Sequence, residues 1–220
     1  MENNDFMAVD IQRESALASS KVLRNTYMLL AATVLFSAMT AGVSMAIQAP
    51  YMGLWMILPY FVLLFLTEKF KNSALGLVFV FALTGWLGFT IGPILSMYLA
   101  VQGSEPILLA LGGTALIFFS LSGYVLVTRK DLSFMTGFLT VGILVAFIAG
   151  IANYFLQISG LGLAVSSMFL LLASGLIMWQ TSAIIHGGET NYISATVTLY
   201  VMLYNIFLSL LHLIGVSSND

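Results

Sequence analysis

The sequence contains no cysteine. This absence excludes disulfide bonds, thiolate metal sites and cysteine nucleophiles together, and it indicates no particular compartment. Charged residues are also scarce: they make up 7% of the 220 residues, whereas a soluble domain carries about a quarter. Because the net charge is only −2 and no basic cluster is present, nothing in the sequence indicates nucleic-acid binding.

Apolar residues are abundant instead. They make up 60% of the chain, and the mean hydropathy is +1.03. A soluble fold of this size cannot bury so much apolar surface, so a lipid bilayer must surround most of the chain. A transmembrane β-barrel would show alternating segments of about ten residues, and the sequence has none. We therefore predict an all-α, polytopic membrane protein without a second, soluble domain.

Seven apolar segments are each long enough to cross a membrane, which takes about 20 residues for roughly 30 Å of hydrocarbon. The expected helices are 22–47, 52–67, 73–100, 105–127, 133–157, 161–185 and 192–214. Pro59 lies inside the second segment, which is the shortest. Gly92 and Pro93 lie inside the third, and we expect them to kink that helix or to end it early.

The basic residues indicate the orientation of the chain in the membrane. All of them fall in the N-terminal segment or in loops that share its side: Arg13, Lys21, Arg24, Lys69, Lys71, Arg129 and Lys130. Cytoplasmic loops carry an excess of lysine and arginine, so we expect a multi-pass membrane protein with its N-terminus in the cytoplasm and its C-terminus on the opposite side of the membrane. The predicted layout is an N-terminal tail over 1–20, a transmembrane domain over 21–216 and a short tail over 217–220.

The N-terminal tail is polar and acidic. Its charged residues before Lys21 are Glu2, Asp5, Asp10, Arg13 and Glu14. A secretory signal begins with a positively charged region, so we interpret the first apolar segment as a retained helix. A polar segment of this composition is expected to be flexible and exposed to the cytoplasm.

Residues for catalysis are missing from the expected spans. Apart from Arg24 and Glu105, which lie at the ends of two spans, no Lys, Arg, Asp or Glu lies within them, which excludes a Schiff-base lysine and paired carboxylates for an ion or proton relay. The only histidines, His186 and His212, lack the spacing of a zinc site. We therefore predict no catalytic, metal or cofactor site, and no enzyme activity.

A few uncharged polar residues do lie in the spans, and they form the candidate polar core. These residues are Asn153, Gln180, Asn205 and Ser209, and the last two share a face of the seventh helix with Thr198 and His212. Such a face either lines a water-filled cavity or makes interhelical hydrogen bonds, and the second reading is favoured. The pair Gly88 and Gly92 is a small-residue face, which we expect to pack helices within one chain.

Several ordered segments resemble the Bax inhibitor-1/YccA family and, within it, the bacterial YccA branch. They are 21–27 (KVLRNTY), 92–95 (GPIL), 112–120 (GGTALIFFS), 128–134 (TRKDLSF), 152–157 (ANYFLQ), 186–193 (HGGETNYI) and 204–207 (YNIF). The resemblance extends from about residue 21 to the end. It implies a bundle of seven helices in which six surround a central one.

For the YccA branch, the resemblance also implies a modulator of FtsH, a membrane-anchored, ATP-dependent zinc protease. Such a protein associates with the protease complex and restrains the degradation of membrane proteins such as unassembled SecY. Its cytoplasmic N-terminal tail, here residues 1–20, serves as the segment that the protease engages. The implied partners are therefore the FtsH complex and the lipid bilayer, and the implied location is the bacterial inner membrane, with the C-terminus in the periplasm.

The wider family offers an alternative function, a calcium leak channel controlled by two carboxylates on the sixth and seventh helices. The matching positions here are Gln180 and Met202, and neither side chain ionises. A divalent cation buried without a carboxylate loses hydration with little compensation. This chain therefore departs from the channel pattern at the residues that carry it, although other residues remain available to line a pore.

Overall fold

The computed structural model describes residues 2–158 and 160–217, with side chains from Leu17 onward. Its helices are α1 (Glu2–Ala46), α2 (Ile57–Phe70), α3 (Ala74–Gln102), α4 (Glu105–Thr128), α5 (Thr136–Leu156), α6 (Leu161–Ile185) and α7 (Tyr192–Ser217), and short 3-10 turns, η1 (Gly53–Met56) and η2 (Ser133–Met135), precede α2 and α5. Each of seven segments among the described residues is long and apolar enough to span a bilayer. The all-α, seven-span prediction is confirmed.

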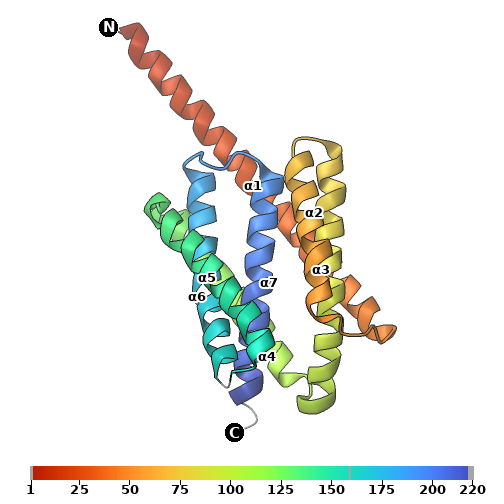
Figure 1. Cartoon of the computed structure of the whole chain (residues 1–220). Coiled ribbons are helices and arrows are strands. Elements are labelled where there is room, and N and C mark those ends of the chain that lie inside the picture. The colour runs from red at the N-terminus through yellow and green to blue at the C-terminus, as the bar shows by residue number, and fades with distance from the viewer. Residues whose placement is uncertain (1, 159, 218–220) are drawn as a thin grey trace.

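Successive helices run in opposite directions, so the two ends of the chain lie at opposite ends of the bundle (Figure 1). The α2–α3, α4–α5 and α6–α7 loops share the end from which the N-terminus projects, which we call the N-terminal end. The predicted orientation assumed that the loops with basic residues lie on the same side of the membrane as the N-terminal segment, and the structure agrees with that assumption. The last residues of the expected C-terminal tail, 218–220, lie outside the described residues.

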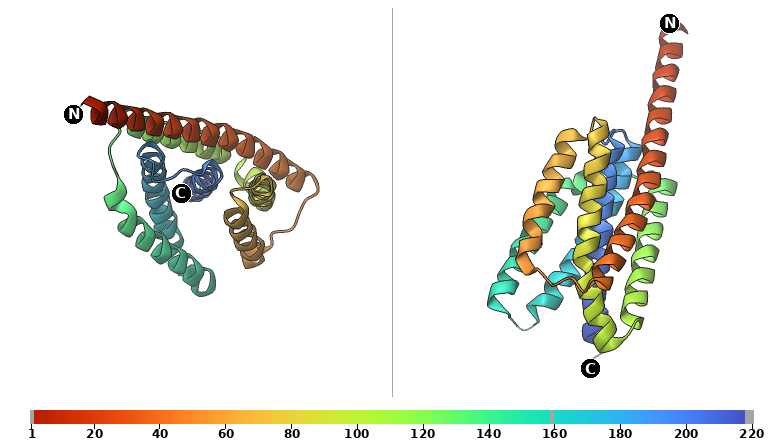
Figure 2. Two further views of the ribbon diagram at one scale, coloured as in Figure 1. Left: turned by 90° about the horizontal axis from the view of Figure 1, so that it is seen from above. Right: turned by 90° about the vertical axis from the view of Figure 1, so that its right-hand side faces the viewer.

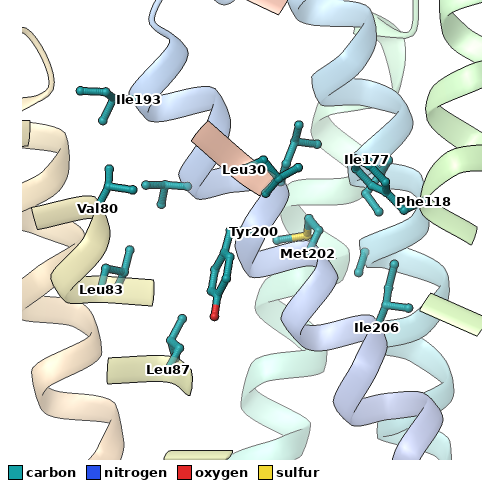
Figure 3. Close-up of a cluster of buried hydrophobic side chains, with 13 residues drawn as sticks. Leu30, Val80, Leu83, Leu87, Phe118, Ile177, Ile193, Tyr200, Met202 and Ile206 are labelled. Carbon is teal, nitrogen blue, oxygen red and sulfur yellow. The ribbon is translucent and has the colours of Figure 1, made fainter. Parts of the chain in front are cut away.

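Helix α7 occupies the middle of the bundle and packs against α1, α2, α3, α4 and α6 (Figure 2). Helix α5 packs chiefly against α6, on the outside. The main apolar cluster joins both sides of α7: Val80, Leu83 and Leu87 of α3 lie on one side of Tyr200, and Leu30, Phe118 and Ile177 lie on the other (Figure 3). The bundle is therefore built around α7.

Helix α1 differs most from its prediction. We expected a flexible tail over 1–20, but the helix begins at Glu2 and continues without a break into the apolar segment Leu17–Ala46. The chain has no glycine before Gly42 and no proline before Pro50, so nothing interrupts the helix. Because the membrane span already supplies a helical nucleus, each further residue adds a hydrogen bond without a new nucleation cost.

Helix α3 also differs, because it continues through Pro93 to Gln102. The prediction that Gly92 and Pro93 end this helix early is wrong, whereas a kink there stays a prediction. Contacts on both sides of the proline hold the helix in place, since Gly92 packs against Ser44 of α1 and Tyr98 packs against Gly215 of α7. In α2, Pro59 lies in the first turn, where its missing N–H has no intrahelical partner to lose.

Candidate functional site

The N-terminal extension, which we define as residues 2–16, is the most distinctive feature of the surface. It projects from the bundle as the first part of α1 (Figures 1 and 2). At 1.5 Å of rise per residue it is about 22 Å long. The predicted tail residues Glu2, Asp5, Asp10, Arg13 and Glu14 all belong to it, although their side chains lie outside the described part of the structure. The chain therefore carries an accessible helical segment at the N-terminal end of the bundle.

Behind this extension, α1 packs closely against α3. A Cβ added at Gly88 would lie 2.3 Å from the Ser37 carbonyl oxygen, and one at Gly92 would lie 2.5 Å from the Ser44 Cβ. One turn earlier, a Cβ at Gly85 would lie 2.6 Å from the Phe36 ring. The predicted packing of the Gly88 and Gly92 face within one chain is confirmed. These glycines let the two backbones touch.

Helix α7 makes a row of hydrogen bonds to the same two helices through residues spaced four apart. The Thr196 hydroxyl lies 3.2 Å from the Thr26 carbonyl oxygen of α1, and it shares its hydrogen between that oxygen and the nearer Tyr192 carbonyl oxygen of its own helix, at 2.7 Å. The Tyr200 hydroxyl donates to the Thr84 carbonyl oxygen of α3 at 3.2 Å and also contacts the Ser37 hydroxyl of α1.

Tyr204 completes this row, since its hydroxyl lies 3.3 Å from the Thr90 hydroxyl of α3. Sequence reasoning missed the row because it took Asn205 and Ser209 as the candidate polar residues of the seventh helix. The spacing of Thr196, Tyr200 and Tyr204 was the available signal.

The predicted polar residues of α7 lie elsewhere on the helix. Asn205 is half-buried, and its amide donates to the Val201 carbonyl oxygen of the same helix at 2.7 Å. Ser209 is buried and Thr198 is half-buried. The structure does not bring Asn205 and Ser209 together with Gln180 into one cluster of hydrogen bonds among the described residues.

Gln180 is buried on α6, with only 2% of its surface exposed, and its amide nitrogen has no hydrogen-bond partner. Ser182, also buried, holds the α4–α5 loop in place: its hydroxyl accepts from the Leu132 N–H at 3.0 Å and donates to the Lys130 carbonyl oxygen at 2.9 Å. Met202, the other position of the channel pattern, lies in the main apolar cluster. The position at which the channel pattern places its second carboxylate is therefore occupied by an apolar, buried side chain in this chain.

At the opposite end of the bundle, α5, α6 and α7 meet at polar groups. The Ser166 hydroxyl lies 2.7 Å from His212 Nδ1. A Cβ added at Gly162 would lie 3.3 Å from both Asn153 Nδ2 and His212 Cε1. The Asn153 amide and the His212 imidazole therefore both pack against Gly162 of α6. The side-chain amide oxygen of Asn153, Oδ1, is buried without a hydrogen-bond partner. Sequence reasoning could not pair Ser166 with His212, because the two residues lie on different helices.

Charged groups gather at the N-terminal end of the bundle. Lys71 forms an ion pair with Glu68 at 2.9 Å, and the hydrogen bond to Glu68 raises the pKa of Lys71. The Ser133 N–H donates to the Asp131 carboxylate at 2.9 Å, and this hydrogen bond lowers the pKa of Asp131. No group of three or more His, Asp or Glu residues is placed to hold a metal ion within the described ranges.

A side-chain amide connects two of these loops. Asn191 Nδ2 donates to the Lys71 carbonyl oxygen at 3.2 Å and to Asn72 Oδ1 at 2.7 Å. Its own Oδ1 accepts the first N–H groups of α7, from Ile193 at 2.9 Å and Ser194 at 3.2 Å. The α2–α3 and α6–α7 loops are thereby fixed to each other beside the start of α7.

Comparison with known families agrees with this architecture. A family model described as inhibitor of apoptosis-promoting Bax1 matches residues 19–219. The chain belongs to this Bax1-I family. The whole N-terminal extension precedes the matched region.

Individual relatives narrow the comparison further. The chain is 53% identical over 209 residues to a protein of Escherichia coli K12 named "Modulator of FtsH protease YccA", with 94% of this chain and 95% of the relative covered. An equally similar protein of Escherichia coli O6:H1 is named "Inner membrane protein YccA". An uncharacterized Pseudomonas aeruginosa protein is 52% identical over 215 residues, with 95% of this chain and 97% of that one covered. These findings confirm the resemblance to the YccA branch.

Proposed function

We propose that this chain is a modulator of the FtsH protease in the bacterial inner membrane. The observation that carries this proposal is the 53% identity, over 94% of the chain, to the Escherichia coli modulator. The role is one of binding and regulation rather than catalysis. The partners are the FtsH complex and the bilayer that surrounds the seven helices.

The orientation follows from the placement of the basic residues. Lys69, Lys71, Arg129 and Lys130 lie in or beside loops at the N-terminal end of the bundle (Figure 1). The positive-inside rule assigns that end to the cytoplasm and the C-terminal end to the periplasm. The N-terminal extension then projects into the cytoplasm.

The charge of the extension supports this presentation. Within residues 2–16 there are four acidic residues, Glu2, Asp5, Asp10 and Glu14, against the single basic residue Arg13. The cytoplasmic leaflet carries anionic lipids and a negative surface potential. An acidic helix is repelled by that surface, while the basic loops around its base are attracted to it. The extension therefore stands away from the membrane, where a protease can engage it.

The proposed mechanism is competition for the protease. The protease engages the N-terminal extension and pulls on it, but the packed bundle resists extraction, so the protease stays occupied. The degradation of membrane substrates such as unassembled SecY then slows. The calcium-channel alternative receives no specific support from the structure, because Met202 lies in the apolar core.

The test follows the decay of unassembled SecY in cells that overproduce the chain. We expect slower decay with the complete chain and decay at the normal rate with a chain that lacks residues 2–16. The deletion stops at residue 16 because the apolar span begins at Leu17. Removal of residues 218–220, at the other end of the chain, serves as the matched control. Equal decay with and without the complete, correctly inserted chain would contradict the proposal.

A further inference from the structure

The packing of α1 points to a more specific account of how the chain resists extraction, and this account rests on the proposed function. We infer that the contacts of α1 with α3 and α7 set the rate at which a protease that pulls on the N-terminal extension removes the chain from the membrane. We call these contacts the α1 interface. On α1 they are Ser37, Thr40 and Ser44, and their partners are Gly88, Gly92 and Tyr200.

The first step is mechanical continuity. The extension and the first membrane span are one helix from Glu2 to Ala46, and no glycine or proline interrupts it before Gly42. A helix without such breaks has no hinge at which the extension can move independently of the span. Tension applied to the extension therefore acts along the axis of the span.

The second step is the geometry of the contact with α3. A Cβ added at Gly88 would lie 2.3 Å from the Ser37 carbonyl oxygen and 2.4 Å from the Thr40 hydroxyl oxygen. A Cβ added at Gly92 would lie equally close to the Ser44 side chain, at 2.5 Å. The small residues of α1 thus sit in notches of the α3 surface. Sliding α1 by one turn, about 5.4 Å, takes them out of these notches. The close contact is lost as a unit, because protein interiors are packed too densely to deform continuously.

The third step is the connection to α7. Tyr200 is buried, with 4% of its surface exposed, and its hydroxyl contacts Ser37 of α1 and donates to the Thr84 carbonyl oxygen of α3. The hydroxyl of the fully buried Thr196 lies 3.2 Å from the Thr26 carbonyl oxygen of α1, and its nearer acceptor is the Tyr192 carbonyl oxygen of its own helix, at 2.7 Å. Movement of α1 breaks the contact between Ser37 and Tyr200 and separates Thr26 from Thr196 within the bilayer, where no water replaces the lost partners. The start of extraction therefore has to overcome the α3 and α7 contacts together.

A disulfide across the α1 interface tests the inference in the complete chain, which has no cysteine of its own. The pair is Ser44→Cys with Gly92→Cys, since a Cβ at Gly92 lies 2.5 Å from the Ser44 Cβ and the helices must separate by roughly 1 Å to reach disulfide geometry. The control pair, Gly142→Cys with Leu172→Cys, joins α5 to α6. We measure the degradation of each chain by the purified protease in liposomes, oxidised and reduced.

A second set of variants covers the case in which the cysteine pair does not fold. Tyr200→Phe removes the hydroxyl that contacts α1, whereas Tyr204→Phe removes a hydroxyl that joins α7 to α3 only. We expect Tyr200→Phe to be degraded about threefold faster than the unmodified chain, as the loss of one membrane hydrogen bond predicts. Tyr204→Phe is expected to stay closer to the rate of the unmodified chain.

The results separate the inference from the proposed function. We expect oxidation to stop degradation of the α1–α3 pair and to leave the α5–α6 pair nearly unaffected. If the unmodified chain slows degradation of a membrane substrate but the oxidised α1–α3 pair is degraded as fast as the reduced one, the inference is wrong. Equal acceleration by Tyr200→Phe and Tyr204→Phe would also overturn it. If the unmodified chain does not slow that substrate at all, the proposed function itself fails.

Discussion

Helices α1 and α5 cross the same membrane, but they are held in different ways. Helix α1 touches the backbone of α3 at glycines and exchanges hydrogen bonds with the central helix α7. Helix α5 packs chiefly on α6 and exposes large apolar side chains, such as Phe138, Val141 and Ile148, toward the lipid. The first is part of the central structure, and the second is a peripheral span.

This difference shows that hydropathy does not report how firmly a span is held. The α5 segment is the most hydropathic of the seven spans found among the described residues, yet it is among the least buried. In a bilayer, apolar side chains gain nothing by leaving lipid for protein, so close contacts and hydrogen bonds decide which helices hold together. Glycines and hydroxyl groups therefore mark the strong interface here.

Alanine substitutions of three glycines give the largest expected difference between the two regions. Gly88→Ala places a Cβ against the Ser37 backbone and should cost roughly 1–3 kcal/mol of unfolding free energy. Gly142→Ala meets only the flexible end of Leu172, at 2.5 Å, and should cost below about 1 kcal/mol. Gly137→Ala, with nothing within 4 Å, should change stability by less than about 0.5 kcal/mol.

Equilibrium unfolding in detergent micelles measures these three values. The comparison between regions fails if Gly137→Ala, at the start of α5, destabilises the chain as much as Gly88→Ala does.

Hydrogen-bond deletions give a smaller contrast. Tyr200→Phe removes a buried hydroxyl that contacts both α1 and α3, and we expect a loss of about 1 kcal/mol. Trp179→Phe removes the bond from the indole N–H to the Thr136 hydroxyl, 2.8 Å long and exposed at the α5–α6 contact. Its loss should stay below about 0.5 kcal/mol. The same unfolding assay compares the two, and a larger effect for Trp179→Phe would reverse the assignment of the strong interface.

The smallest expected effect concerns pH at the loop that leads into α5. The Ser133 N–H lowers the pKa of the Asp131 carboxyl below its unfolded value of about 3.9. A lowered pKa contributes stability that is fully present above pH of about 4 and is lost as the pH falls through the folded-state value. Asp131→Asn should therefore be slightly less stable than the unmodified chain at neutral pH, and this difference should disappear as the pH falls through the folded-state pKa of Asp131.

Thermal unfolding of the two chains between neutral and acid pH checks this expectation. A stability difference that persists at the same size in acid would mean that the side chain acts through a contact that does not depend on its charge.

The sequence predicts the number, order and approximate bounds of the spans, because their length and hydropathy are set by the bilayer. It predicts the contact of Gly88 and Gly92 within the chain, because only small residues permit so close an approach. It does not predict which face of α7 makes the hydrogen bonds. That helix is central and meets neighbours on most sides, so polar periodicity does not separate a buried face from an exposed one.

For the same reason, the row of Thr196, Tyr200 and Tyr204 was missed in favour of Asn205 and Ser209. The helical extension was also missed, since its polar composition favours disorder in isolation, whereas continuity with the span favours helix. Both misses arise from tertiary context that the local sequence does not contain.

The most direct measurement uses purified components. The FtsH protease, a membrane substrate and this chain are placed in one liposome preparation, and the rate of substrate degradation is recorded. Our account predicts a lower rate with the complete chain and an unchanged rate with the chain that lacks residues 2–16. An equal rate in both cases and without the chain, with insertion verified, would contradict the claim that this protein modulates the protease through its N-terminal extension.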